Sequence, residues 1–396
     1  MKKNKKILKT VCIVLAGLLV FAFIFWKLAP SSFKLKIVKI LSTKQVVRDV
    51  IEDRVGDNYE EKVRDTEFKE EEIVVPEEAA KKLTGYKNIV LFGVDARGSE
   101  FDSETRSDTI MIVSINNDTG AIRMVSLYRD TIMRVMRPDG SSFYGKVNSA
   151  YTLGGVQAAL STLNTNLDLN IDDYVVVNFS GLAEIIDLMG GIDIKITDLE
   201  MRRINKIGSD MQNEGVGAFT ELTEFGDVHL DGMQATAYCR IRDAAFYDEE
   251  GNDYHYDYGR TARQRYVISK LVDKAKSSGI SKLLDLAVQI MNMNTTERTF
   301  MKTSLQYDEV MDLIPVMIDY KLEGSSGFPY TQDTPIVDGN DYVVPQGLAV
   351  NVTALHAFLF NDSEYVPSQS VQEINDYIIE YTGVQPKQPE NGPVLP

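Results

Sequence analysis

The chain has 396 residues, 44% of them hydrophobic, which is enough to bury a full core, and two or three domains would also fit. Its net charge of −16 argues against general nucleic-acid binding, because a negative molecule repels a polyanion. Two cysteines and three histidines, with no histidines at ligand spacing, argue against a disulfide framework and a zinc site. Because the chain as a whole is negative, any anion site must be formed by a local group of basic residues.

The first thirty residues are typical of a membrane anchor. Five lysines precede an uncharged apolar run from Val11 to Trp26, which approaches the roughly 20 residues that span a bilayer. A cleaved signal peptide is the alternative, but the run is long and lacks a small-residue cleavage pattern. Because lysines stay on the cytoplasmic side, we expect a cytoplasmic N-terminus (residues 1–10), one transmembrane helix (11–29) and an extracellular remainder in a single-pass protein of the cell membrane.

Beyond residue 29 the chain holds 36 basic against 58 acidic residues, a net charge of −22. Residues 30–83 are mostly densely charged with thin hydrophobic spacing, which predicts a solvated, partly helical stalk; a short accessory subdomain is the alternative. Four prolines in residues 383–396 predict a disordered tail. The folded unit is therefore expected at 84–382.

The folded unit is expected to alternate between strands and helices. Three buried strands are predicted at 88–95, 109–115 and 121–127, the last two joined by the turn sequence NNDTG. A helix containing Leu160, a strand at 174–179, a helix from about Ser180 and the strand IDIKI follow, and further helices are predicted at 260–276, 281–292, 308–320 and 352–359. This order predicts an α/β domain with one mixed sheet and helices on both faces.

Charged residues are predicted to meet at one edge of that sheet. Antiparallel pairing of the first three strands brings together Asp95, Asp108, Arg129 and Asp130, and the intervening loop adds Arg97 and Arg106. Carboxylates hold divalent cations and guanidinium groups bind phosphate, so the edge has the components of a metal and phosphate site. Ordinary salt bridging between loops is the alternative.

Residues 240–265 hold five arginines and no lysine. Arg240 and Arg242 alternate in YCRIR, which predicts a strand with both side chains on one face. A helix starting near Gly259 would place Arg260, Arg263 and Gln264 in its first turn, where basic residues are favourable only if an anion lies between them. The alternative is internal pairing, since the segment also has six acidic residues.

Eight ordered segments together resemble the LytR-CpsA-Psr family of Gram-positive wall enzymes. They read NIVLFGVDARG, TRSDTIMIV, MVSLYRDT, GKVNSAYTLGG, DYVVVNFSGL, MGGIDIKI, HLDGMQATAYCRIRD and DYGRTARQR. The resemblance spans about residues 84–380 and implies a three-layer α/β/α catalytic domain behind one N-terminal transmembrane helix. It further implies a phosphotransferase that moves an anionic glycopolymer from an undecaprenyl pyrophosphate carrier to peptidoglycan, at the 6-hydroxyl of N-acetylmuramic acid.

The resemblance also implies roles for individual residues. Asp95 and Asp108 would hold a magnesium ion, for which manganese could substitute, and Asp95 would help to deprotonate the acceptor hydroxyl or instead orient an arginine. The other implied catalytic residues are Arg129, Arg240 and Arg242. The implied pyrophosphate and lipid-head contacts are Arg97, Arg106, Lys146, Arg260, Arg263 and Gln264.

Two other functions remain open at this point. A prenyl pyrophosphate phosphatase would use the same groups with water as the acceptor. A wall-polymer-binding regulator without catalysis is the second alternative, although the segment MKKNKK is too short to hold an effector domain. The aromatic loop between Arg242 and Gly259 is either a lid over the acceptor glycan or a surface loop without a binding role.

Overall fold

The computed structural model describes residues 63–95, 105, 107–248, 251–295, 298–306, 309–310 and 321–389. The expected membrane helix, most of the expected stalk, Arg97 and Arg106 lie outside these ranges, as does most of the helix expected at 308–320. Within the described ranges, no helix combines the length and the apolar character needed to cross a bilayer.

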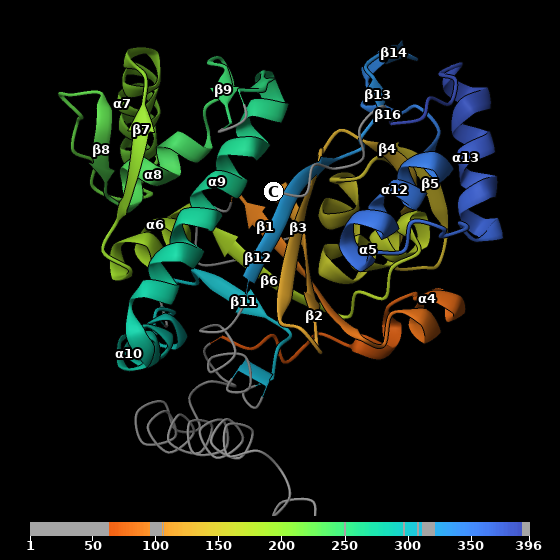
Figure 1. The fold of residues 1–396 in the computed structure, drawn as a ribbon, viewed down its shortest axis with the longest axis horizontal. Coiled ribbons are helices and arrows are strands. Elements are labelled where there is room, and N and C mark those ends of the chain that lie inside the picture. The colour runs from red at the N-terminus through yellow and green to blue at the C-terminus, as the bar shows by residue number, and fades with distance from the viewer. Residues whose placement is uncertain are drawn as a thin grey trace, which may run out of the picture.

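A six-stranded mixed sheet forms the centre of the fold (Figure 1). Its strands, in spatial order, are β11 (Met301–Thr303), β6 (Asp173–Asn178), β1 (Tyr86–Val94), β2 (Ser107–Asn116), β3 (Ala121–Leu127) and β12 (Lys321–Phe328). β6 and β1 are parallel, as are β3 and β12, whereas the other pairs are antiparallel. The expected first three strands and the mixed sheet are therefore confirmed.

Helices cover both faces of this sheet (Figure 1). On one side lie α4 (Glu77–Lys82), α5 (Ser149–Leu167), α12 (Leu348–Phe360) and α13 (Gln369–Thr382), with β4 (Ile132–Met136) and β5 (Ser142–Lys146). On the other side lie α6 (Phe179–Leu188), α7 (Asp198–Asn213), α8 (Gly232–Cys239), α9 (Tyr256–Ser277) and α10 (Gly279–Met291), with β7 (Ile192–Ile196), β8 (Gly226–Leu230), β9 (Phe246–Tyr247) and β10 (Asp253–Tyr254). Each side has its own buried apolar cluster.

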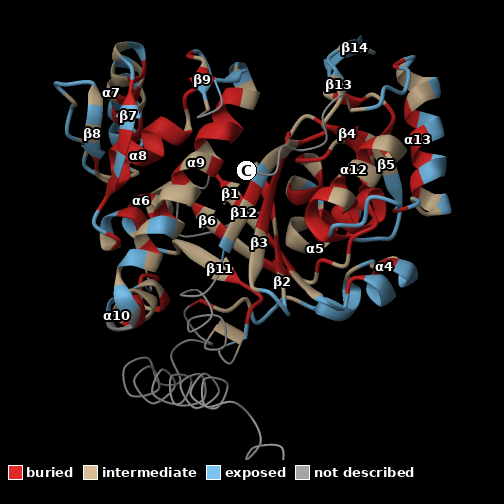
Figure 2. Cartoon of the chain, in the orientation of Figure 1, coloured by how far each residue is buried: buried red, intermediate tan, exposed pale blue. Residues whose placement is uncertain are grey.

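Short elements complete the described part of the chain. They are η1 (Glu70–Glu72), β13 (Gln332–Asp333), β14 (Ile336–Val337), β15 (Asn340–Asp341) and β16 (Val344–Pro345). Figure 2 shows that the central strands are largely buried, while the exposed residues lie mainly on the outer helices and loops. The sheet therefore forms a buried scaffold between the two layers of helices.

Local signals explain the hairpin that places β2 beside β3. The side-chain oxygen of Asn116 accepts hydrogen bonds from the backbone N–H groups of Asp118 and Thr119, and Gly120 adopts a φ of 70°. The register that follows pairs Ile110 with Leu127. Residues just before β2 and just after β3 consequently share one edge of the sheet.

The expected strand at YCRIR is wrong. Asp231 caps a helix in a capping box with Gln234, and this helix, α8, continues to Cys239. Arg240 is its C-cap residue, and Arg242 follows in a loop. Alternation of polar and apolar residues at a helix end resembles the period of a strand, which explains the error.

The folded unit extends beyond both expected boundaries. Val63 and Leu83 are buried, and the Thr303 N–H donates a hydrogen bond to the Val63 carbonyl at 3.1 Å. The described end of the expected tail also packs on the domain, since Val384 is buried and the Lys387 N–H donates to the Gln346 carbonyl at 3.0 Å. Residues 63–83 therefore do not form a free stalk.

Other expectations are refined by the structure. The helices expected at 260–276, 281–292 and 352–359 are confirmed as α9, α10 and α12. The IDIKI strand is confirmed as β7, but it pairs with β8 in a separate two-stranded sheet. The sequence analysis did not predict α7 or α13.

Candidate anion-binding site

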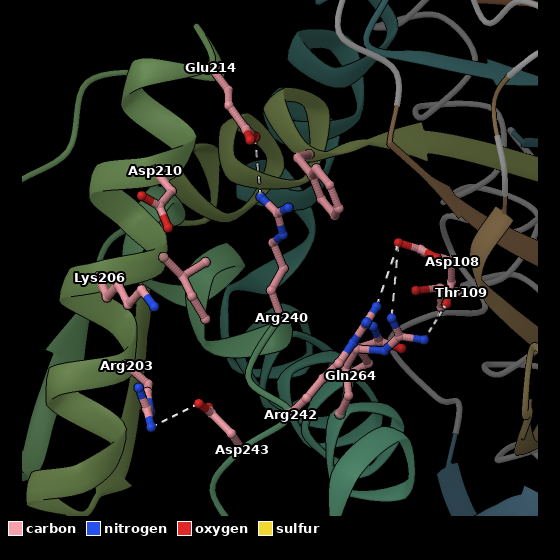
Figure 3. A pocket seen from close by; sticks show the side chains of 13 residues that line it. Asp108, Thr109, Arg203, Lys206, Asp210, Glu214, Arg240, Arg242, Asp243 and Gln264 are labelled. Carbon is pink, nitrogen blue, oxygen red and sulfur yellow. Dashed lines mark hydrogen bonds and ion pairs between the residues drawn. The ribbon is translucent and has the colours of Figure 1, made fainter.

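A pocket of about 350 Å³ lies between the start of β2 and α7 (Figure 3). Its lining combines charged residues with a small apolar part: Asp108, Thr109, Phe179, Arg203, Lys206, Ile207, Asp210, Glu214, Arg240, Arg242, Asp243, Arg260 and Gln264. Four segments of the sequence therefore meet in one cavity: β2, the start of α6, α7 and the region from 240 to 264.

Asp108 lies at the end of the pocket beside the central sheet. The β1–β2 register shifts between Gly93 and Val94, because Gly93 faces Thr109 while Val94 faces Ser107. Asp108 is thus the extra residue of a β-bulge, a feature that often re-aims a side chain next to a functional site. The Asp108 side chain is directed into the pocket (Figure 3).

Three guanidinium groups surround the Asp108 carboxylate. Arg129 donates a hydrogen bond from Nη1 to Asp108 Oδ1. Arg242 Nη2 and Arg260 Nη1 each lie 4.0 Å from Asp108 Oδ2. Arg260 also donates from Nη2 to the Asp108 backbone carbonyl at 2.9 Å. The predicted meeting of Asp108 with these arginines is therefore confirmed.

Asp257, which the sequence analysis did not single out, is a second carboxylate in the same cluster. Its Oδ1 lies 2.8 Å from Arg260 Nη2, 3.8 Å from Arg242 Nε and 3.9 Å from Arg129 Nε. α9 begins at Tyr256, so Asp257 occupies the first turn, where a negative charge is favourable. Arg260 lies beyond the first turn, contrary to the expectation.

Burial and charge act in opposite directions on the arginines. Burial lowers the pKa of the Arg260 guanidinium to about 10, with Asp257 partly offsetting this and Arg242 adding to it. For Arg129, burial lowers the pKa, but the neighbouring carboxylates of Asp108 and Asp257 raise it above its usual value. Both groups stay positively charged at neutral pH.

Several polar atoms of this cluster are buried without a hydrogen bond. They are Arg129 Nε, Arg260 Nε and Gln264 Oε1. A buried polar atom without a partner costs roughly 1–3 kcal/mol, so each is a place where a water or a ligand group would be favourable. The unsatisfied donors on two arginines fit an anion.

Lys146 and Arg240 are each paired with a carboxylate, and of the two only Arg240 lines the pocket. Lys146 Nζ lies 3.1 Å from Asp130 Oδ1, and Arg129 Nε lies 3.6 Å from Asp130 Oδ2. Arg240 stacks over the Phe179 ring at 4.2 Å from its centroid, and its Nη1 lies 3.9 Å from Glu214 Oε2. Gln264 donates from Nε2 to the Cys239 carbonyl at 3.4 Å.

Arg263 does not line the pocket, although the sequence analysis grouped it with Arg260. Its side chain is fully buried, and its Nη2 lies 2.7 Å from Glu200 Oε1 and 2.8 Å from the Ala245 carbonyl. The ring of Tyr238 lies beneath the same guanidinium. Arg263 is therefore a packing residue that joins α9 to α7.

Asp95 directly follows β1 and is half-buried, but it does not line this pocket. Within the described residues, no three histidine, cysteine or acidic side chains are grouped closely enough to hold a metal. Magnesium commonly takes one or two carboxylates together with substrate phosphates and water. Asp108 lines the pocket and Asp95 does not, so magnesium binding by these two carboxylates stays a prediction.

A family model identifies the class of protein. The model of the LytR_cpsA_psr family matches residues 51–351, so the chain belongs to this family. The family resemblance inferred from the eight segments is thereby confirmed.

Two of the similar proteins are named for different roles, one as a regulatory protein and one as a transferase. The chain is 30% identical to Biofilm regulatory protein A of Streptococcus mutans serotype c, over 64% of this chain and 59% of the relative. It is 31% identical to the polyisoprenyl-teichoic acid–peptidoglycan teichoic acid transferase TagU of Bacillus cereus, over 57% of this chain and 63% of the relative. The chain thus matches about three fifths of the length of these relatives.

Solved structures share the fold. Protein gbs0355 of Streptococcus agalactiae superposes with a TM-score of 0.56 at 26% identity, covering 75% of this chain and 93% of that one. EF0465 of Enterococcus faecalis, described as a transcriptional regulator, superposes with a TM-score of 0.52 at 26% identity, covering 76% of this chain and 97% of that one. The mixed α/β architecture is therefore shared with both proteins.

Proposed function

We propose that the chain is a phosphotransferase that moves an anionic glycopolymer from an undecaprenyl pyrophosphate carrier to the 6-hydroxyl of N-acetylmuramic acid in peptidoglycan. The proposal places the folded domain outside the cell membrane, held by the N-terminal apolar segment. Family membership and the relative named as a teichoic acid transferase support this reaction class. The glycopolymer itself is left open.

The observation that carries the proposal is the cluster of Arg129, Arg242 and Arg260 in a chain with a net charge of −16. Arginine presents planar, paired donors that suit phosphate oxygens. Arg242 and Arg260 line a cavity, and all three surround Asp108. A pyrophosphate in this cavity would meet donors from Arg242, in the loop after α8, and from Arg260, on α9.

The reaction needs positioning and charge neutralisation. The acceptor hydroxyl oxygen forms a bond to the phosphorus that carries the glycopolymer, and the bond from that phosphorus to the bridging oxygen breaks, so that undecaprenyl phosphate leaves. The hydroxyl proton passes to a base, for which Asp95 is the proposed group. Arg129, Arg242 and Arg260 would stabilise the charge that develops on the leaving phosphate.

Magnesium is part of the proposal. Asp108 and Asp95 are the residues that would hold it, and a bound ion would neutralise charge on the pyrophosphate oxygens. Arg240, Lys146 and Gln264 would bind the pyrophosphate and lipid head group around this centre. Arg97 and Arg106 keep the same proposed role.

The test uses the purified full chain in detergent with a polyprenyl pyrophosphate-linked glycopolymer, peptidoglycan and magnesium. We expect polymer to become covalently attached to peptidoglycan as prenyl phosphate is released. Arg242→Gln should reduce this rate by about 10²-fold or more, the usual cost of one preorganised donor. Arg202→Gln is the matched control, because Arg202 pairs with Asp198 on the outer face of α7.

The same assay separates the alternatives. Release of phosphate at the same rate without peptidoglycan would identify a prenyl pyrophosphate phosphatase. Tight binding of the lipid-linked polymer with no bond cleavage would identify a binding regulator, the kind of role named for the Streptococcus mutans relative. Either result would overturn the transferase proposal.

A further inference from the structure

The pocket has a second wall, opposite Asp108, formed by one face of α7 (Figure 3). The wall consists of residues spaced three or four apart: Arg203, Lys206, Ile207, Asp210 and Glu214. The neighbouring face of the helix is packed, since Ile204 and Met211 are buried. This charged wall is therefore presented to the cavity by the amphipathic pattern of the helix.

The two ends of the wall are tied to the arginine side of the pocket. Arg203 Nη2 lies 2.8 Å from Asp243 Oδ2, and Glu214 Oε2 lies 3.9 Å from Arg240 Nη1. These ion pairs join α7 to the loop that follows α8. Arg203 and Glu214 are therefore engaged by ion pairs and are not free to bind a ligand.

Between these two ion pairs, Lys206 and Asp210 also line the cavity (Figure 3). They are four residues apart on a helix, a spacing at which opposite charges commonly pair. No ion pair or side-chain hydrogen bond joins either of them to another residue within the described part of the chain. Their polar atoms are available to a ligand.

The charge of the wall indicates what kind of group fits it. Arg203 and Lys206 balance Asp210 and Glu214, so the wall is neutral overall, in contrast to the arginine cluster on the other side. A second phosphate would meet two carboxylates there. A neutral group rich in hydroxyls would instead find donors, acceptors and the apolar edge of Ile207.

We infer that this wall of α7 is a sugar subsite, in which Lys206 and Asp210 recognise the neutral sugar directly attached to the pyrophosphate of the donor. The inference rests on the proposed function, because it assumes that the pyrophosphate occupies the arginine side of the same cavity. It makes Lys206 and Asp210 specificity-determining residues for the donor rather than catalytic ones.

The test compares three probes by binding to the purified full chain. They are a polyprenyl pyrophosphate, the same lipid carrying one N-acetylhexosamine, and a soluble muramyl disaccharide. The variants are Lys206→Ala and Asp210→Ala, because alanine favours the helix. Arg202→Ala on the outer face of α7 is the control, since Arg202 pairs with Asp198 away from the cavity.

We expect each variant to weaken binding of the sugar-bearing lipid by roughly fivefold to tenfold, the size of one net hydrogen bond, and to leave the bare lipid unchanged. Equal affinity of wild type and both variants for the sugar-bearing lipid would overturn the inference. Weaker binding of the disaccharide alone would also overturn it and assign the wall to the acceptor. If wild type binds neither lipid, the proposed function itself fails, which is a distinct result.

Discussion

Replacement of Asp108 by asparagine provides the sharpest test of the arginine cluster. The Asp108 carboxylate occupies the space that an anion would need, with three guanidinium groups around it. Asparagine keeps the shape of the side chain and removes its negative charge. We therefore predict that Asp108→Asn binds inorganic pyrophosphate more tightly than wild type when no metal is present.

The size of the effect follows from the distances. Arg242 Nη2 and Arg260 Nη1 each lie 4.0 Å from Asp108 Oδ2, so a phosphate oxygen held by both would lie close to that carboxylate oxygen. At about 4 Å, two like charges repel by about 1 kcal/mol in bulk water and about 4 kcal/mol near a protein surface. The Asp108 side chain is 24% exposed, so an intermediate value of about 2 kcal/mol, or roughly 30-fold in Kd, is expected.

The assay is isothermal titration of pyrophosphate into wild type and Asp108→Asn, first with a chelator and then with magnesium. Magnesium should improve binding to wild type more than binding to the variant, because Asp108 is a proposed ligand of the ion. Asp118→Asn, in the exposed turn at the far end of β2, is the matched control. Weaker binding by Asp108→Asn without metal would refute this reasoning and show that Asp108 instead holds the arginines in place.

Further predictions concern the site and the core. Arg242→Lys should lower the transfer rate by at least tenfold at unchanged melting temperature, because lysine cannot form paired contacts; equal rates would refute a bidentate role. Arg263→Gln should instead lower the free energy of unfolding by about 3–5 kcal/mol in denaturant titrations, because it leaves Glu200 buried and unpaired, and a mild effect would contradict this. Burial lowers the pKa of the His356 imidazole to about 4. Between about pH 4 and 6.5 the unfolded chain therefore binds more protons than the folded chain. The free energy of unfolding should fall by up to about 3 kcal/mol as the pH drops through that range. Thermal unfolding of His356→Gln should show a smaller loss over the same range.

Local signals predicted the sheet edge where the site lies. The turn sequence after Asn116 fixed the β2–β3 hairpin, and the antiparallel register then brought Asp108 and Arg129 together. The same reasoning could not show that Asp108 is the extra residue of a β-bulge in β2, opposite Gly93 and Val94, because an extra residue leaves little trace in an alternating pattern.

Partners distant in sequence were harder to predict. The spacing of Arg260 and Arg263 on α9 suggested a shared face, yet Arg263 is held by Glu200, which lies on α7, a helix not predicted. Only tertiary packing decides which arginine meets a buried carboxylate. Asp257 could have been found from sequence, because an acidic residue at the start of a helix that carries arginines is a ready partner for them.

The two carboxylates explain how an acidic chain keeps several arginines in one buried place. Arg260 is only 3% exposed, and a buried guanidinium without a counter-charge would be strongly destabilising. Asp108 and Asp257 provide that counter-charge before a ligand arrives, so an incoming anion must compete with them. A single weak negative charge competes poorly, whereas a pyrophosphate with a divalent cation satisfies the arginines and the carboxylates together. If the proposed function holds, we therefore expect this partly neutralised cluster to bind pyrophosphate together with a divalent cation in preference to simple anions.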